Sequence, residues 1–275
     1  MKLGVVELLL VTTLPALFLA SDGVPPLLIT AATLIGGTLA AGAANAFNMV
    51  IESDLDQLMG RTSKRPIVND QISEARALTF AFSLTIIALG IFWFFTTRLA
   101  TALTAGAIIF YVFVYTVGLK RRTSQNIVWG GIAGCFPVVI GWSAITNSIS
   151  WTSVFFFLLI FFWTPPHFWA LAIKYRDDYS AAGIPMLPSV APMKKVARQI
   201  WLYSLAMFLF SFATLKSTAA PIWSYGIATA LAIFFALLLP GLEGKNGEKV
   251  ALRIFHGSIT YLSLFSILLV VIAFV

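Results

Sequence analysis

The sequence predicts an all-helical integral membrane protein. Of its 275 residues, 59% are hydrophobic and only 11% are charged, and the mean hydropathy is +0.92. This composition leaves too few polar side chains to cover a water-soluble surface. Apolar stretches of roughly 20 residues, the length of a helix that crosses a bilayer, recur along the chain, whereas the alternating segments of barrel strands do not appear. We therefore expect one helical membrane domain over residues 1–275.

The apolar stretches predict about nine membrane-spanning helices. The first resembles a signal peptide, but Glu7 lies inside it and no soluble region follows, so we interpret it as a helix that is kept. The expected spans are 4–21, 25–49, 76–95, 98–117, 127–146, 152–174, 198–216, 220–240 and 254–275.

Basic residues predict the orientation of the bundle. Of the 18 Lys and Arg residues, only Arg98 and Lys216 fall on the side opposite the rest. The positive-inside rule therefore predicts a multi-pass protein of the cell membrane with a cytoplasmic N-terminus and Val275 outside. The excess positive charge is explained by topology, and no basic stripe is long enough to indicate nucleic-acid binding.

An acidic cluster follows the second span, in "NMVIESDLDQLMGRTSKRP" at residues 48–66. Asn48, Glu52 and Asp56 are four residues apart, so they share one face if the helix continues past residue 49. Asp54 would point toward the loop. Carboxylates at this spacing repel each other, and acids at the C-terminal end of a helix oppose its dipole. The cluster is therefore either a solvated helix end neutralised by nearby cations or a site for a divalent metal.

A second acidic cluster follows the sixth span, in "WTPPHFWALAIKYRDDYSAAGIPMLP" at residues 163–188. His167, Lys174 and Asp178 have the spacing of one helical face, with Asp177 beside it. The predicted topology puts both clusters on the cytoplasmic side. Oxygen ligands without Cys or paired His favour Mg²⁺, which keeps waters and bridges carboxylates to phosphate oxygens.

The cations near these acids exceed what is needed to neutralise them, which suits a polyanion such as diphosphate. A diphosphate at the mouth of a membrane protein suggests an isoprenyl diphosphate. Loss of diphosphate from an allylic carbon leaves a carbocation, which aromatic faces stabilise. The aromatic residues near the mouth are Tyr115, Trp163, Phe168, Trp169, Tyr175 and Tyr179.

The chain resembles the UbiA superfamily of membrane prenyltransferases and, within it, the protohaem IX farnesyltransferases. The motif N-x-x-x-D-x-x-x-D matches "NMVIESDLD", with Glu52 in place of the middle Asp, and M-x-R-T-x-x-R-P matches "MGRTSKRP". Further signatures resemble residues 119–142, 163–179 and 182–188. The chain departs from the usual "LTKPR" near the N-terminus, where it reads "MKLG".

The resemblance implies a UbiA-type bundle with its active-site mouth on the cytoplasmic side, and transfer of a farnesyl group from farnesyl diphosphate to a vinyl group of haem B. The implied cofactor is Mg²⁺. Possible partners are haem A synthase and oxidase assembly factors. The implied catalytic residues are Asp56, Asp178, Lys174 and His167, and the metal ligands are Asn48, Glu52, Asp54, Asp56, Asp177 and Asp178. The implied diphosphate-binding residues are Asn48, Arg61, Lys64, Arg65, Lys120, Arg121 and Asn126.

His167 and Trp169 are the residues that we assign to haem, although a lone membrane His is as often a hydrogen-bonded packing residue. His256 matches no signature, and we interpret it as structural. Two other functions stay open. A related enzyme would prenylate an aromatic quinone precursor, and an ion-coupled transporter would also place carboxylates in helices, although near the bilayer midplane and not at one membrane face.

Overall fold

The computed structural model describes residues 3–60 and 62–275, with side chains from residue 11 onward except at 61. The helices are α1 (Leu3–Ser21), α2 (Leu27–Ile51), α3 (Ser53–Leu58), α4 (Glu74–Phe95), α5 (Arg98–Ile109), the π-helix η1 (Phe110–Leu119), α6 (Asn126–Gly130), α7 (Ile132–Thr146), α8 (Trp151–Lys174), α9 (Arg176–Ala181), α10 (Leu187–Val190), α11 (Met193–Ser217), α12 (Ile222–Leu238) and α13 (Gly247–Ile272). No strand occurs within these described ranges.

Local chemistry accounts for where many of the helices begin. Ser73 and Thr97 are N-cap residues whose side chains accept hydrogen bonds from the first turns of α4 and α5. Ser150 and Ser153 form a reciprocal capping box at the start of α8. Proline precedes α2, α11 and α12, where the chain has to leave an extended conformation.

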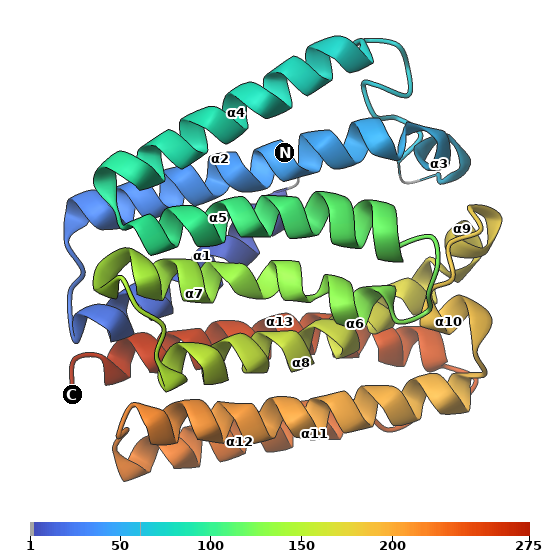
Figure 1. The fold of residues 1–275 in the computed structure, drawn as a ribbon. Helices are drawn as coiled ribbons and strands as arrows, with labels where there is room; N and C mark the ends of the chain where they lie inside the picture. The colour runs from blue at the N-terminus through green and yellow to red at the C-terminus, as the bar shows by residue number, and fades with distance from the viewer. Residues whose placement is uncertain (1–2, 61) are drawn as a thin grey trace.

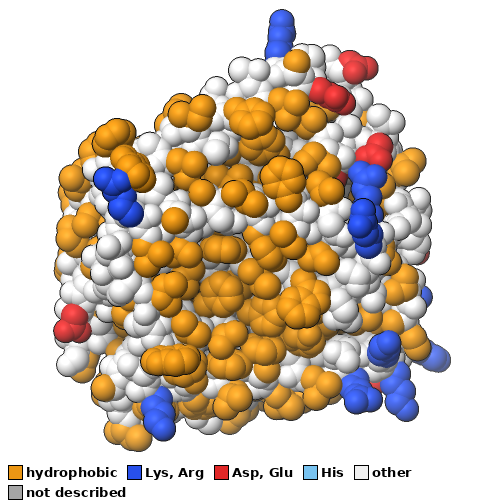
Figure 2. Space-filling view, viewed as in Figure 1, with side chains coloured by type: hydrophobic (Ala, Val, Ile, Leu, Met, Phe, Trp, Pro, Cys, Tyr) orange, Lys and Arg blue, Asp and Glu red, His pale blue; other side chains and the backbone are white. Residues whose placement is uncertain are grey.

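The long helices run side by side, and α3, α9 and α10 gather at one end of the bundle (Figure 1). We call this the site end. In the described chain, seven segments are long and apolar enough to cross a membrane, and Val11–Ser21 and Ile222–Leu238 are shorter apolar helices. Hydrophobic side chains cover the middle of the visible face, and charged ones lie mainly toward its edges (Figure 2). The chain is therefore a multi-pass helical membrane protein.

The expected spans correspond to these helices, with two differences at their starts. α11 begins five residues before the expected 198, and α13 begins seven residues before the expected 254. The early turns carry Lys194, Lys195 and Lys249, which an apolar-run criterion excludes. A helix does not have to end where the hydrocarbon ends, so these turns extend beyond the apolar part.

The largest buried cluster lies among α8, α11, α12 and α13, and includes Trp163, Trp169, Phe235, Tyr261 and Phe265. A second cluster joins α2, α4 and α5. A further cluster connects α1, α4, α5 and α7. The cavity described next lies between α2, α5–η1, α7 and α8.

Candidate active site

A cavity of about 360 Å³ extends from the site end into the apolar part of the bundle. α2 lines it from Thr33 to Asn48, which corresponds to about 22 Å along a helix. Its site end is polar and includes Asn48, Asp56, Arg65 and Lys120. Most of the remaining lining is apolar and comes from residues such as Ala40, Ala44, Ile108, Phe136, Ile140, Phe168 and Leu171. The arrangement suits a molecule with a charged head and a long apolar tail.

The first acidic segment bends where the sequence predicts one continuous face. α2 ends at Ile51, Glu52 has φ −109°, and α3 starts at Ser53. Backbone hydrogen bonds from Glu52 N to Asn48 O (3.0 Å) and from Asp56 N to Glu52 O (2.9 Å) keep the helical spacing across the bend. All three side chains are buried, with Glu52 only 1% exposed and Asp56 3% exposed.

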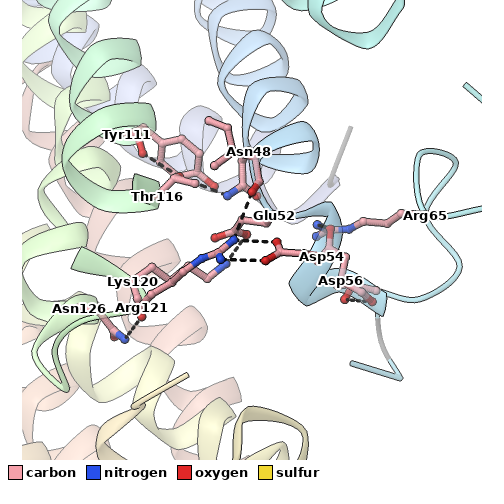
Figure 3. A network of polar contacts seen from close by, with 12 residues as sticks. Asn48, Glu52, Asp54, Asp56, Arg65, Tyr111, Thr116, Lys120, Arg121 and Asn126 are labelled. Atoms are coloured by element: carbon pink, nitrogen blue, oxygen red, sulfur yellow. Dashed lines mark hydrogen bonds and ion pairs between the residues drawn. The ribbon is translucent and has the colours of Figure 1, made fainter. Parts of the chain in front are cut away.

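Two cations neutralise the buried carboxylates (Figure 3). Lys120 Nζ donates to Glu52 Oε2 over 2.5 Å, and the Arg65 guanidinium donates to Asp56 Oδ2. Arg65 comes from the loop after α3, and Lys120 follows η1, 68 residues beyond Glu52. Charge-assisted bonds of this kind are about twice as strong as neutral ones. The protein therefore holds both acids and both cations of the predicted site at one place.

Asp54 and Arg121 form a separate pair outside the cavity. Arg121 donates to both Asp54 oxygens, at 2.8 and 2.9 Å, and to Ile51 O at 3.2 Å. Hydrogen bonding by Arg121 lowers the pKa of Asp54, and hydrogen bonding by Asp54 raises the pKa of Arg121. The Asp54 side chain is 61% exposed. The expected turn of Asp54 toward the loop agrees with this position, but here neither Asp54 nor Arg121 faces the cavity.

The π-helix η1 places a polar partner beside Asn48. Asn48 Nδ2 donates to Thr116 Oγ1 over 3.2 Å, and Thr116 Oγ1 donates to Tyr111 O over 2.9 Å. Since the amide nitrogen is used in this way, the Asn48 oxygen is the atom left to act as a ligand. Tyr111 and Tyr115 also line the cavity, with ring centroids 5.5 Å apart.

Gly130 makes room for one of these rings. A Cβ atom at residue 130 would lie 2.2 Å from Tyr115 Cδ2, a distance that no side chain could occupy without moving the ring. The α6 backbone therefore approaches the tyrosine ring directly. The Gly130 position in the "WGGIAG" stretch thus shapes the cavity wall as well as helix packing.

Two buried oxygens at this end have no hydrogen-bond partner: Glu52 Oε1 and Asn126 Oδ1. Asn126 Nδ2 donates to Lys120 O over 3.2 Å, which fixes the turn that carries Lys120. An unpartnered buried acceptor costs about 1–3 kcal/mol, and more when it is charged. A bound cation or a donor group on a ligand would satisfy these atoms.

The residues present fit a divalent cation that keeps most of its own water. Among the described side chains, no three His, Cys, Asp or Glu residues are grouped closely enough to hold a metal. Mg²⁺ commonly binds through one or two carboxylates together with waters and substrate phosphates. Glu52 and Asp56, with the Asn48 oxygen, are such a donor set.

The second acidic cluster is arranged differently from the expectation. α8 ends at Lys174, Tyr175 interrupts the helix, and Asp177 and Asp178 lie in the short helix α9. Lys174 and Asp177 are exposed, Asp178 is half-buried, and none of the three lines the cavity. The predicted continuous face through His167, Lys174 and Asp178 is therefore wrong, because the helix breaks before the aspartates. Both acidic clusters nevertheless lie at the site end (Figure 1).

The two residues assigned to haem point away from the cavity. His167 Nδ1 lies 2.8 Å from Ser258 Oγ of α13, and its ring stacks on Trp163 with centroids 4.3 Å apart. Trp169 is fully buried in the core and packs edge-on against Tyr203 at 5.3 Å. The cavity side of α8 is instead formed by Thr164, Phe168 and Leu171. His167 therefore does not line this cavity, and Trp169 has no exposed surface.

The remaining cations predicted to bind diphosphate do not line the cavity in the described part of the chain. Arg61 lies outside the described residues, and Lys64 is exposed and does not line the cavity. Sequence reasoning missed Tyr111, Thr116 and Thr62. The Thr62 hydroxyl donates to Asp56 O over 3.1 Å. The pair Tyr111 and Tyr115 has helical spacing that could have indicated a shared face. The contact of Thr116 depends on π-helical geometry, which has no clear sequence signal.

Comparison with known proteins identifies the family. The model of the UbiA prenyltransferase family matches residues 9–259. The chain belongs to the UbiA prenyltransferase family. Proteins named protoheme IX farnesyltransferase are similar over the whole chain. The one from Frankia casuarinae is 49% identical over 100% of this chain and 96% of its own length, and the one from Streptomyces coelicolor is 47% identical over 95% and 85%.

Solved structures share the fold of this UbiA family member. A UbiA homolog from Aeropyrum pernix has a TM-score of 0.74 at 17% identity and covers 98% of this chain and 96% of its own. A digeranylgeranylglyceryl phosphate synthase has a TM-score of 0.79 at 14% identity over 98% and 99%. A UbiA homolog from Archaeoglobus fulgidus, described as bound to DMAPP and Mg²⁺, has a TM-score of 0.69 at 14% identity over 97% and 96%.

Proposed function

We propose that this chain transfers the farnesyl group of farnesyl diphosphate to a vinyl group of haem B, as a single membrane domain. The observation that carries this is a deep apolar cavity with a polar end lined by Asp56, Arg65 and Lys120, where the buried Glu52 is paired with Lys120. The identity of 49% to proteins named protoheme IX farnesyltransferase supports haem B as the acceptor. The UbiA homolog described with DMAPP and Mg²⁺ supports a prenyl diphosphate and Mg²⁺ at this kind of site.

The reaction balances with water as the third reactant. The allylic C–O bond of the donor breaks, and diphosphate leaves with the electron pair. The terminal vinyl carbon of haem B bonds to the farnesyl C1, and water adds to the inner vinyl carbon with loss of a proton. Bound Mg²⁺ would neutralise charge on the leaving diphosphate.

The ion pairs of the site suggest how donor and metal depend on each other. Glu52 and Asp56, with the Asn48 oxygen, would hold the metal, and Lys120 and Arg65 would then be released from these carboxylates to bind diphosphate oxygens. Without the metal the cations are already neutralised, so the diphosphate would find little free positive charge. Metal and diphosphate should therefore each increase the affinity for the other.

The other predicted site residues keep narrower roles in this proposal. Asp178, with Asp177, is proposed for a second metal, since Tyr179 of the same short helix lines the cavity. Lys174, together with Arg61, Lys64 and Arg121, would add positive charge that attracts the donor to the mouth. Asn126 would hold the Lys120 turn and offer its unpartnered oxygen. His167 remains assigned to the acceptor and Trp169 to packing.

The site end is proposed to face the cytoplasm of a cell-membrane protein, because all but two of the Lys and Arg residues belong to the N-terminus and the loops predicted on that side. The C-terminus would then lie outside. The reaction implies a later haem-modifying enzyme, such as haem A synthase, and oxidase assembly factors as functional partners. Labelling of single cysteines placed at Ser63 and Ser180, in a Cys135→Ser background, should occur from the cytoplasmic side.

Acceptor identity is tested by competition. Purified protein in lipid nanodiscs receives Mg²⁺ and labelled farnesyl diphosphate, with haem B and an aromatic acid offered together. The proposal expects the label in a farnesylated, hydrated haem. Label in the aromatic acid alone would instead support the quinone-precursor alternative.

A further inference from the structure

One exposed stripe of α13 changes from charged to apolar along its length. Lys249, Arg253 and His256 are all exposed and have the spacing of one helical face. Farther from the site end, the same face continues through the exposed side chains of Leu264 and Ile267. His256 lies where the charged part meets the apolar part. A histidine at such a boundary is costly to keep against lipid and is a functional candidate by default.

The His256 ring is held in one tautomer. Its Nδ1 lies 2.8 Å from Leu252 O, and a carbonyl oxygen only accepts hydrogen bonds, so Nδ1 carries the proton. Nε2 is therefore the ring nitrogen that could bind a ligand, and the side chain that carries it is exposed. A ring that donates through one nitrogen to a backbone carbonyl is the usual arrangement of a metal-ligating histidine.

We propose that this stripe of α13 docks haem B from the membrane, with His256 Nε2 on the iron and Arg253 and Lys249 on the propionates. This inference rests on the proposed function, which makes haem B the acceptor. Helical rise places Arg253 about 4–5 Å and Lys249 about 10 Å closer to the site end than His256. Haem has its iron at the centre and both propionates at one edge, so the carboxylates would reach the membrane surface while the ring stays in lipid.

A second imidazole lies close to the stripe, one residue before a side chain that lines the cavity. The Phe255 ring contacts His167 with centroids 4.6 Å apart and His256 with centroids 5.1 Å apart. Ser258 Oγ donates to Phe255 O over 2.7 Å, so His167 Nδ1 must donate to Ser258 Oγ, and His167 Nε2 is also unprotonated. The next residue of α8, Phe168, lines the cavity. Haem docked at His256 would thus lie beside a second potential ligand on the way to the donor.

Haem titration of the purified protein in nanodiscs, without farnesyl diphosphate, tests the docking site. His256→Ala should lower haem B affinity by about tenfold or more and remove the visible-absorbance signature of imidazole ligation. Affinity for metal-free protoporphyrin should change much less, because the ring and propionate contacts remain. Arg253→Gln should weaken both porphyrins. Thr229→Ala is the control, since Thr229 is exposed on α12 and does not belong to this stripe, and it should behave as wild type.

Turnover separates this inference from the proposed function. If His256→Ala affects only the docking of haem, the KM for haem B should rise while kcat at saturating haem changes little. Wild-type haem affinity and spectrum in His256→Ala would overturn the docking site, even with haem farnesylation intact. Failure of the wild-type protein to farnesylate haem B would overturn the proposed function, whatever the spectra show.

Discussion

Replacing Lys120 with methionine should strengthen metal binding in the absence of donor and weaken binding of the donor. Lys120 Nζ lies 2.5 Å from Glu52 Oε2, and Glu52 is buried. A hydrogen bond to a charged group contributes about 1.5–3 kcal/mol, and a metal that binds Glu52 has to displace it. Methionine keeps most of the side-chain volume but removes the competing charge. At 1.4 kcal/mol per factor of ten, metal affinity should rise about 10- to 100-fold.

Mn²⁺ binding followed by electron paramagnetic resonance measures the first effect. Inorganic diphosphate binding in the presence of metal measures the second. Lys216→Met is the matched control, because Lys216 is exposed in the last turn of α11, at the end of the bundle opposite the site end, and it should change neither affinity. Metal should also raise the thermal stability of Lys120→Met more than that of wild type. Unchanged or weaker metal binding by Lys120→Met would refute the proposal that the metal displaces Lys120 from Glu52.

Three further changes test other parts of the site. Asp56→Asn should lower turnover by about 10²–10³, because it removes charge stabilisation where the leaving group develops, while Asp70→Asn, an exposed loop change, should have little effect in the same product assay. Asp178→Ala should cause a loss of about the same order if α9 supplies a second metal ligand, and near-normal turnover would remove that role. Thr104→Phe should fill the part of the cavity far from the site end and shift the donor preference from farnesyl to geranyl diphosphate, whereas Thr104→Val should not. Competition of the two donors measures the preference. If the two variants had the same preference, this wall of the cavity would not limit chain length.

The sequence predicts the spans and the grouping of the first acidic cluster well, because both depend on local patterns. A run of apolar residues reports the hydrocarbon-crossing part of a helix directly. The spacing of Asn48, Glu52 and Asp56 gives their common position even though the helix bends at Glu52, since the backbone hydrogen bonds keep the helical separation.

The second cluster was predicted less well because helical spacing assumes that the helix continues. A single residue, Tyr175, leaves the helical conformation, and this moves Asp178 off the face shared by His167 and Lys174. The direction of His167 depends on Ser258, 91 residues away, which no local pattern reports. The early starts of α11 and α13 show the same limit, because their charged turns belong to helices that extend beyond the apolar run.

The central structural claim is that one cavity holds the farnesyl chain with its diphosphate at Glu52 and Asp56. Photocrosslinking with a farnesyl diphosphate analogue that carries a diazirine at the end of the chain, followed by peptide mapping, tests it most directly. We expect metal-dependent labelling of α2, α5 or α7 residues far from the site end, such as Thr33, Thr104 or Ile140. Labelling concentrated on α11 or α12, or labelling of the cavity that does not depend on Asp56, would contradict it.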